Sequence, residues 1–133
     1  MLIKKTFCKE ERLCSKVLLQ ALFTSGSSFL IYPYRVSWLI ATQTQNFPVQ
    51  IVIGVSKKKF KLSVDRNLIK RKIKEVYRLN KQELLYNPLI TQDYKILLSI
   101  NYIGKDIVSQ NMFEAKLKAV FLNLLPQIKA DND

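Results

Sequence analysis

The sequence predicts an α+β domain in which helices pack on one four-stranded sheet. Helical periodicity occurs near the start, the middle and the end of the chain, and β-rich runs lie between these segments in the order αβββαβα. The chain has 133 residues, of which 48% are hydrophobic, enough for the core of one domain. Because no repeat, low-complexity tract or long linker divides it, we expect residues 1–133 to form a single domain.

The first half of the chain contains one predicted helix and three predicted strands. Ser15 is a suitable N-cap for the helix, and Gly26 is placed to end it. Apolar residues recur between them with helical spacing, at Val17, Leu18, Ala21 and Leu22. The β-rich runs cover residues 28–32, 34–42 and 49–55, and Pro33 separates the first two.

The second half adds a strand and a closing helix after a basic segment. The fourth β-rich run covers residues 94–100, and the last helix is predicted over residues 111–125. Its apolar positions have amphipathic spacing and are Phe113, Leu117, Val120, Phe121 and Leu124. We expect Pro126 to stop this helix, because proline lacks the N–H that the helix needs and clashes with the preceding turn.

The basic segment, residues 64–81, is itself predicted to be a helix. On a helical wheel its apolar stripe is formed by Ile69, Ile73, Val76, Tyr77, Asn80 and Leu84. The adjoining arc is almost continuously basic and is formed by Asn67, Lys70, Arg71, Lys74, Arg78 and Lys81. We therefore expect the helix to pack by one flank and to present a cationic ridge on the next.

The charge of the chain is concentrated in and before this helix. Residues 57–81 carry eleven Lys or Arg residues and two acids, which accounts for +9 of the formal net charge of +12. A solvated face is the ordinary explanation of such a run. Here the acids that would pair with it are nearly absent, since Glu75 is the one acid within the helix body. Phosphates along a nucleic-acid backbone are the natural complement, so we expect a polyanionic partner.

The sequence does not support catalysis by the protein's own side chains. It has no histidine and no GxxxxGK[ST] phosphate loop, and its three glycines are isolated. Cys8 and Cys14 fit neither the common zinc spacings nor a disulfide framework, and the acids have no metal-binding spacing. No run approaches the roughly 18 apolar residues of a membrane span, and the start lacks a signal-peptide core. We expect a cytoplasmic binding protein.

The basic segment resembles the protein component of bacterial ribonuclease P. That family has V-S-K-K after a strand, then a short loop and R-N-R-x-K-R, and this chain reads VSKKKFKLSVDRNLIKRKIKEVYR from Val55 to Arg78. CKEERL and LFTSG near the start are also similar to the family. Leu68 replaces the second arginine, Lys74 replaces a later one, and the loop is one residue longer than usual. Leu19 stands where the family often has an aromatic residue.

The resemblance implies a ribosomal-protein-like fold, a two-layer sandwich with an unusual crossover into the last strand. It also implies the non-catalytic protein subunit of an endoribonuclease. The RNA subunit, with Mg2+ held mainly by the RNA, removes the 5′ leader from precursor tRNA, while the protein binds that RNA and the leader. The protein is then expected to be monomeric apart from the RNA complex, with no membrane partner and no catalytic or metal-binding residue. The implied RNA-binding residues are Lys57, Lys58, Arg66, Asn67, Lys70, Arg71, Lys74 and Arg78.

Phe23 and Trp38 are the implied leader-binding residues. In the family, a cleft between the first helix and the sheet stacks the bases of the single-stranded leader on aromatic rings. Phe23, in LFTSG, matches a family aromatic, and Trp38 matches a second one by an ungapped count from Gly26. Core packing is the alternative for both rings. For the whole chain, the alternatives are a ribosomal or general RNA-binding protein and a basic helix that binds DNA or a membrane surface.

Overall fold

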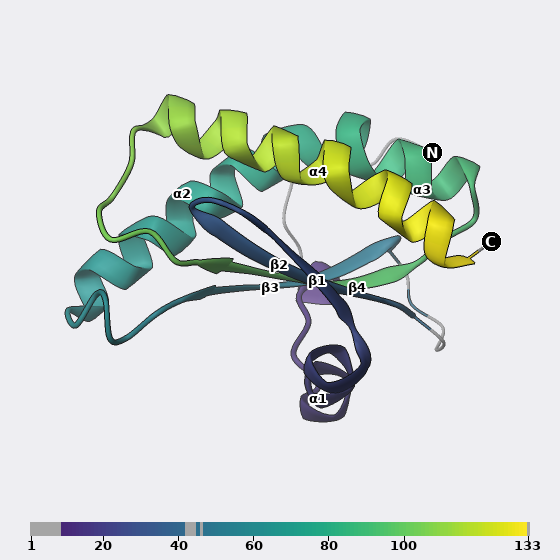
Figure 1. The fold of residues 1–133 in the computed structure, drawn as a ribbon, viewed down its shortest axis with the longest axis horizontal. Helices are drawn as coiled ribbons and strands as arrows, with labels where there is room; N and C mark the ends of the chain where they lie inside the picture. Colours follow the sequence, from purple (N-terminus) through teal and green to yellow (C-terminus); the bar gives the residue numbers. More distant parts are fainter. Residues whose placement is uncertain (1–8, 42–44, 46, 133) are drawn as a thin grey trace.

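The computed structural model describes residues 9–41, 45 and 47–132, with side chains as far as residue 130. A four-stranded sheet carries α1 (Lys16–Ser25) on one face and α2 (Ser63–Lys81) and α4 (Gln110–Asn132) on the other (Figure 1). The strands are β1 (Ser27–Ile31), β2 (Tyr34–Ile40), β3 (Val49–Val55) and β4 (Ile96–Tyr102). The short helix η1 (Lys9–Glu11) precedes α1, while the π-helical turn η2 (Gln82–Tyr86) and α3 (Asn87–Thr91) follow α2. The predicted α+β class and element order are confirmed; α1 lies apart from the main helix layer.

The last strand lies inside the sheet, whose order is β1-β2-β4-β3. β2 is antiparallel to both β1 and β4, whereas β3 and β4 are parallel and are connected through α2. Ile100 of β4 is in register with Val36 of β2 and with Ile53 of β3. β4 therefore has neighbours on both edges, and most of its side chains are buried.

Successive strand residues point to opposite faces of the sheet, so each face buries a cluster of its own. The two clusters differ in size. Under α2 and α4 a large core unites the sheet with helix residues such as Ile69, Ile73 and Phe121. Under α1 a smaller cluster contains Leu13, Leu22 and Leu97. Because this cluster is small, α1 covers only part of the sheet face on which it lies.

Both predicted ends of α1 are confirmed. The hydroxyl of Ser15 accepts a hydrogen bond from the N–H of Leu18 at 3.3 Å, and the N–H of Gly26 donates to the carbonyl of Leu22 at 2.9 Å. A Cβ on Gly26 would lie 2.3 Å from the Leu22 carbonyl oxygen and 2.8 Å from that of Trp38. Glycine is required here because the chain passes so close to two backbone oxygens.

Pro126 does not end the last helix, so that prediction is wrong. α4 continues through Pro126 to Asn132. Proline removes the hydrogen bond to the carbonyl of Leu122, but Leu122 and Pro126 are both exposed, so water can satisfy that carbonyl. Ile128, two residues beyond the proline, is completely buried in the core. Its burial favours continuation of the helix over the break.

Candidate nucleic-acid interface

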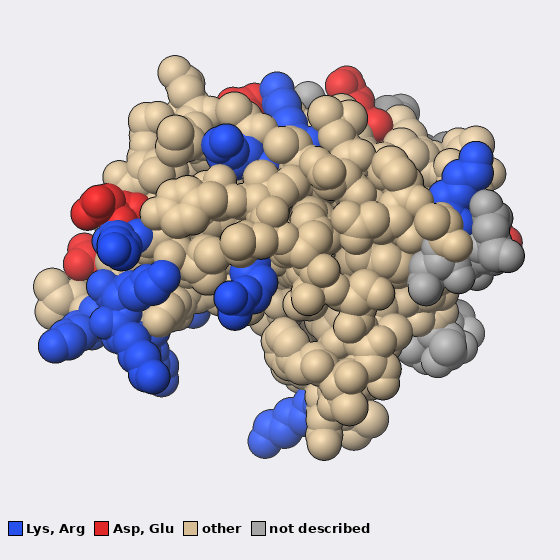
Figure 2. All heavy atoms as spheres, viewed as in Figure 1, with Lys and Arg blue, Asp and Glu red and all other residues tan. Residues whose placement is uncertain are grey.

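A cationic surface covers the loop after β3 and the first turns of α2. Figure 2 shows Lys and Arg side chains gathered at the end of the molecule where α2 begins. The side chains of this surface are exposed or half-buried. We call it the basic surface and define it as Lys57, Lys58, Asn67, Lys70, Arg71 and Lys74.

The α2 part of the basic surface forms a shallow depression of about 550 Å3. Val64 lines it together with four residues predicted to bind RNA: Asn67, Lys70, Arg71 and Lys74. Asn67 lies three and four residues before Lys70 and Arg71, and Lys74 lies four and three residues after them, so all four share one side of the helix. Among the described residues, none of the three cations has an ion-pair partner. Their charge is therefore available to a polyanion.

Arg66, another predicted RNA-binding residue, holds the loop beside it. Its Nη1 donates to the main-chain carbonyl of Phe60 at 2.8 Å and to that of Lys61 at 2.9 Å. These bonds anchor the loop that carries Lys57 and Lys58. Arg66 thus contributes to the basic surface through the loop conformation.

Arg78, the last predicted RNA-binding residue, is engaged with an acid of its own helix. Its Nη2 lies 2.6 Å from Oε1 of Glu75, and its Nε lies 3.3 Å from Oε2. The hydrogen bond from Arg78 lowers the pKa of Glu75, and the same bond raises the pKa of Arg78. This exposed pair neutralises charge on α2 one turn beyond Lys74.

Lys81 does not extend the cationic ridge, contrary to the helical-wheel prediction. Its side chain is completely buried, and its ammonium group binds the carboxylate of Glu11 in η1. Lys81 is still part of α2, but η1 covers this side of the helix and supplies the carboxylate that pairs with the ammonium group. The ridge ends before this residue.

A second depression, of about 500 Å3, lies at the end of the sheet. Three of its residues, Arg35, Gly54 and Asn101, are aligned in register across β2, β3 and β4. They point to the face that carries α1, because Asn101 is four residues from Leu97 on the same strand. Lys59 closes one side and donates to the carbonyl of Ile103.

Sequence reasoning missed this second depression. Arg35 and Asn101 are polar residues inside mainly apolar strands, which is the local signal available. They become neighbours only when β2 and β4 pair, and that pairing could not be read from either strand alone.

The two predicted leader-binding aromatics lie on opposite sides of the sheet. Phe23, in the last turns of α1, is 57% exposed. Trp38 is 2% exposed and belongs to the large core, and its indole N–H donates to Gln127 of α4 at 3.4 Å. Alternation along β2 places Trp38 with Val36, on the face away from α1. Trp38 is a core residue, so its placement in a leader groove is wrong.

The described residues contain no group of three His, Cys, Asp or Glu side chains that could hold a metal ion. Cys14 is exposed and unpaired, while Cys8 lies outside the described residues. No helix in the described part of the chain is long and apolar enough to cross a membrane. The described residues form two polar, cationic surfaces, one on α2 and one at the end of the sheet.

Comparison with curated proteins gives relatives of one kind. A ribonuclease P protein component from Porphyromonas gingivalis is 36% identical over 76 residues, which cover 57% of this chain and 56% of that protein. The match thus spans little more than half the length of this relative. A ribonuclease P protein component from Chlorobaculum tepidum is 32% identical over 120 residues, covering 83% of this chain and 77% of that protein.

Solved structures agree in fold. The ribonuclease P protein from Thermotoga maritima has a TM-score of 0.64 at 21% identity, with 87% of this chain and 96% of that chain covered. The protein from Staphylococcus aureus has a TM-score of 0.63 at 21% identity, with 83% and 91% covered. The family model described as Ribonuclease P matches residues 7–124. The chain therefore belongs to the ribonuclease P family of protein components.

Proposed function

We propose that this protein is the RNA-binding subunit of a ribonuclease P ribonucleoprotein, which removes the 5′ leader of precursor tRNA. The observation that carries the proposal is the α2 depression, where Lys70, Arg71 and Lys74 lie together without an acid partner in the described chain. Family membership makes the ribonuclease P RNA the natural polyanion for this surface. Phosphate binding there releases counterions and so contributes to affinity.

The basic surface is the proposed contact with the RNA subunit. Arg71 offers a planar guanidinium for bidentate phosphate binding, and the lysines act as point charges. Asn67 lines the same depression and supplies an amide. Lys57 and Lys58 extend the contact along the loop that Arg66 anchors.

The sheet face beside α1 is the proposed path of the single-stranded leader. Phe23 presents an exposed ring for base stacking, while Arg35 and Lys59 can neutralise phosphates at the second depression. The amide of Asn101 lines the same depression and offers both a donor and an acceptor.

The cleavage chemistry belongs to the RNA subunit in this proposal. The RNA, with bound Mg2+, would supply hydrolysis of the phosphodiester bond. The described protein residues would bind and orient the two RNAs, and none is assigned a proton-transfer step. The protein would act as one copy in each RNA complex, in the cytoplasm where precursor tRNA is processed.

The test combines the purified protein with ribonuclease P RNA and precursor tRNA at a magnesium concentration too low for the RNA alone. Cleavage at the mature 5′ end should appear only when the protein is added. A variant with Lys70, Arg71 and Lys74 all changed to Ala should fold and fail to rescue cleavage. Tight RNA binding without any rescue by the parent protein would instead identify a general RNA-binding protein.

A further inference from the structure

A buried cluster of ionisable side chains lies between η1 and the end of α2. The carboxylate of Glu11 binds the ammonium group of Lys81 and accepts a hydrogen bond from the hydroxyl of Tyr86 at 2.5 Å. The hydroxyl of Tyr77 lies 3.4 Å from that of Tyr86. All four side chains are at most 1% exposed. Burying a carboxylate and an ammonium is costly, so their arrangement calls for a reason beyond core packing.

The π-helical turn is what brings three of these side chains together. Tyr77 and Lys81 are four residues apart and share one side of α2. Lys81 and Tyr86 are five apart, which in an α-helix would separate them by about 140°. η2 closes hydrogen bonds between residues five apart, so Tyr86 returns to the side of Lys81. The rings of Tyr77 and Tyr86 then lie 5.9 Å and 5.3 Å from the Lys81 ammonium.

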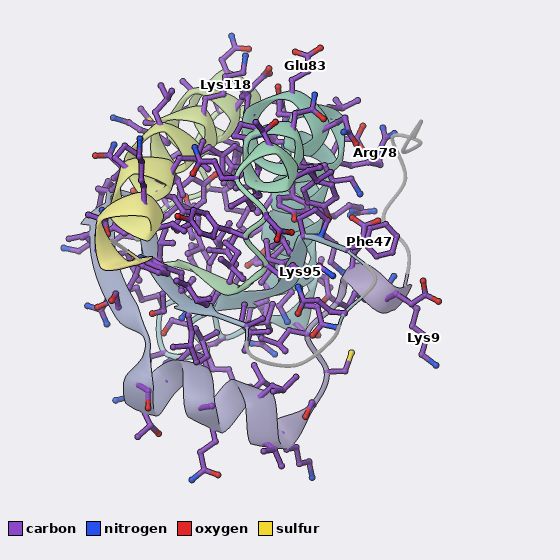
Figure 3. The ribbon with its side chains drawn as sticks, turned by 90° about the vertical axis from the view of Figure 1, so that its right-hand side faces the viewer. Lys9, Phe47, Arg78, Glu83, Lys95 and Lys118 are labelled. Atoms are coloured by element: carbon purple, nitrogen blue, oxygen red, sulfur yellow. The ribbon has the colours of Figure 1, made fainter. Side chains whose placement is uncertain are left out.

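Glu11 belongs to a short segment, residues 9–15, that we call the arm. The arm passes the edge of the sheet, where Arg12 bridges to Ile51 and the N–H of Leu13 donates to the carbonyl of Ile51 at 2.9 Å. Glu11 enters the helix layer, whereas Leu13 enters the small cluster under α1. Figure 3 shows this path: the ribbon descends from η1, marked by Lys9, to α1, while Arg78 marks α2 above.

The arm also borders the basic surface. A groove of about 200 Å3 has Arg12, Leu13 and Cys14 of the arm on one side and Lys70 and Lys74 of α2 on the other. The position of the arm therefore sets the separation between those lysines and the segment that leads into α1.

We infer that Glu11 is a positioning residue, which through Lys81 and Tyr86 locks the arm and so aligns the α1 side of the protein, where the leader lies, with the RNA-binding face of α2. This inference rests on the proposed function. Glu11 is buried and touches neither RNA. Its effect is on the relative placement of two binding surfaces that must hold one substrate complex together.

The test measures leader discrimination, the ratio of the affinities for precursor and mature tRNA, in the complete complex of protein and ribonuclease P RNA. Glu11→Gln removes the charge that holds Lys81, and Tyr86→Phe is a milder change that removes one hydrogen bond to Glu11. Glu11→Gln should lower the ratio about tenfold, which is the size of effect expected when the leader side loses one base stack. Tyr86→Phe should lower it less, and both variants should retain the parent's affinity for the RNA subunit.

Two further variants separate positioning from general destabilisation. The double variant Glu11→Gln with Lys81→Met removes both buried charges and should restore much of the ratio, because no unpaired ammonium remains. Val120→Ala makes a cavity in the core under α4, far from the arm in sequence, and should leave the ratio unchanged in the folded protein.

The outcomes are distinct. If the parent protein shows no preference for precursor tRNA, the proposed function fails. If the parent shows the preference and both Glu11→Gln and Tyr86→Phe keep it in full, the positioning role is overturned. A parallel loss of affinity for the RNA subunit and for mature tRNA would also overturn it, because the effect would then not be specific to the leader side.

Discussion

The guanidinium of Arg66 donates to the main-chain carbonyl of Phe60 at 2.8 Å, which joins the first turn of α2 to the loop before it. Phe60 is itself buried, and its ring lies 6.0 Å from that of Tyr102. A cation at the start of α2 thus also fixes the conformation of the loop that carries Lys57 and Lys58. Removal of Arg66 would therefore change both the local charge and the conformation of this loop.

Arg66→Ala should therefore lower both stability and RNA affinity. Loss of hydrogen bonds from a charged group should reduce the free energy of unfolding by about 1–3 kcal/mol, measured by urea denaturation. Arg71→Ala is the matched control, because it removes an exposed arginine one turn along and should change stability by less than about 0.5 kcal/mol. Equal stability of the two variants would show that the Arg66 bonds do not hold the loop.

Lys70→Ala should weaken binding to the RNA subunit without affecting the fold. If Lys70 neutralises one phosphate, the slope of log affinity against log salt should fall by about one unit. Lys129→Ala removes the same charge from the exposed end of α4 and should leave the slope unchanged. A parallel change in both variants would indicate that net charge, and not the basic surface, determines affinity.

Phe23→Ala should reduce the affinity for precursor tRNA while sparing mature tRNA. Loss of one base stack corresponds to about 1–3 kcal/mol. Trp38→Ala provides the contrast, because truncating a buried aromatic should reduce the free energy of unfolding by about 3–5 kcal/mol and affect both substrates alike. Equal losses for the two substrates with Phe23→Ala would remove Phe23 from the leader path.

Local patterns predicted the elements well. Periodicity and capping depend on neighbours within a few residues, so the ends of α1 and the core stripe of α2 at Ile69, Ile73 and Val76 could be read directly from the sequence. The lysines that line the α2 depression share one side for the same reason. These features need no knowledge of the rest of the chain.

The wrong predictions all depend on distant partners. Lys81 is buried because Glu11, 70 residues away in sequence, supplies its carboxylate. Trp38 lies in the large core because its face of β2 is the one that α2 and α4 cover. Pro126 is tolerated because Ile128 is buried in the same core. The second depression likewise requires the pairing of β2 with β4. Each of these facts follows from topology, which local spacing does not contain.

Alkaline pH should destabilise the protein through its buried tyrosines. Burial raises the pKa of Tyr86, with further effects from Tyr77 and from the hydrogen bond to Glu11, and burial likewise raises the pKa values of Tyr77 and Tyr34. Below about pH 10 these phenols are protonated in both the folded and the unfolded chain, so their contribution is fully present. Above that pH the unfolded chain releases protons that the folded chain retains. Stability should therefore fall as pH rises.

Tyr77→Phe tests this dependence. Each such tyrosine should contribute a slope of about 1.4 kcal/mol per pH unit to the free energy of unfolding, so the variant should lose stability less steeply by about that amount. Urea denaturation at several values between about pH 10 and pH 11 measures the slope, in the range where an ordinary phenol ionises. An unchanged slope in Tyr77→Phe would mean that this hydroxyl ionises equally in both states, and that the cluster around Glu11 is open to water.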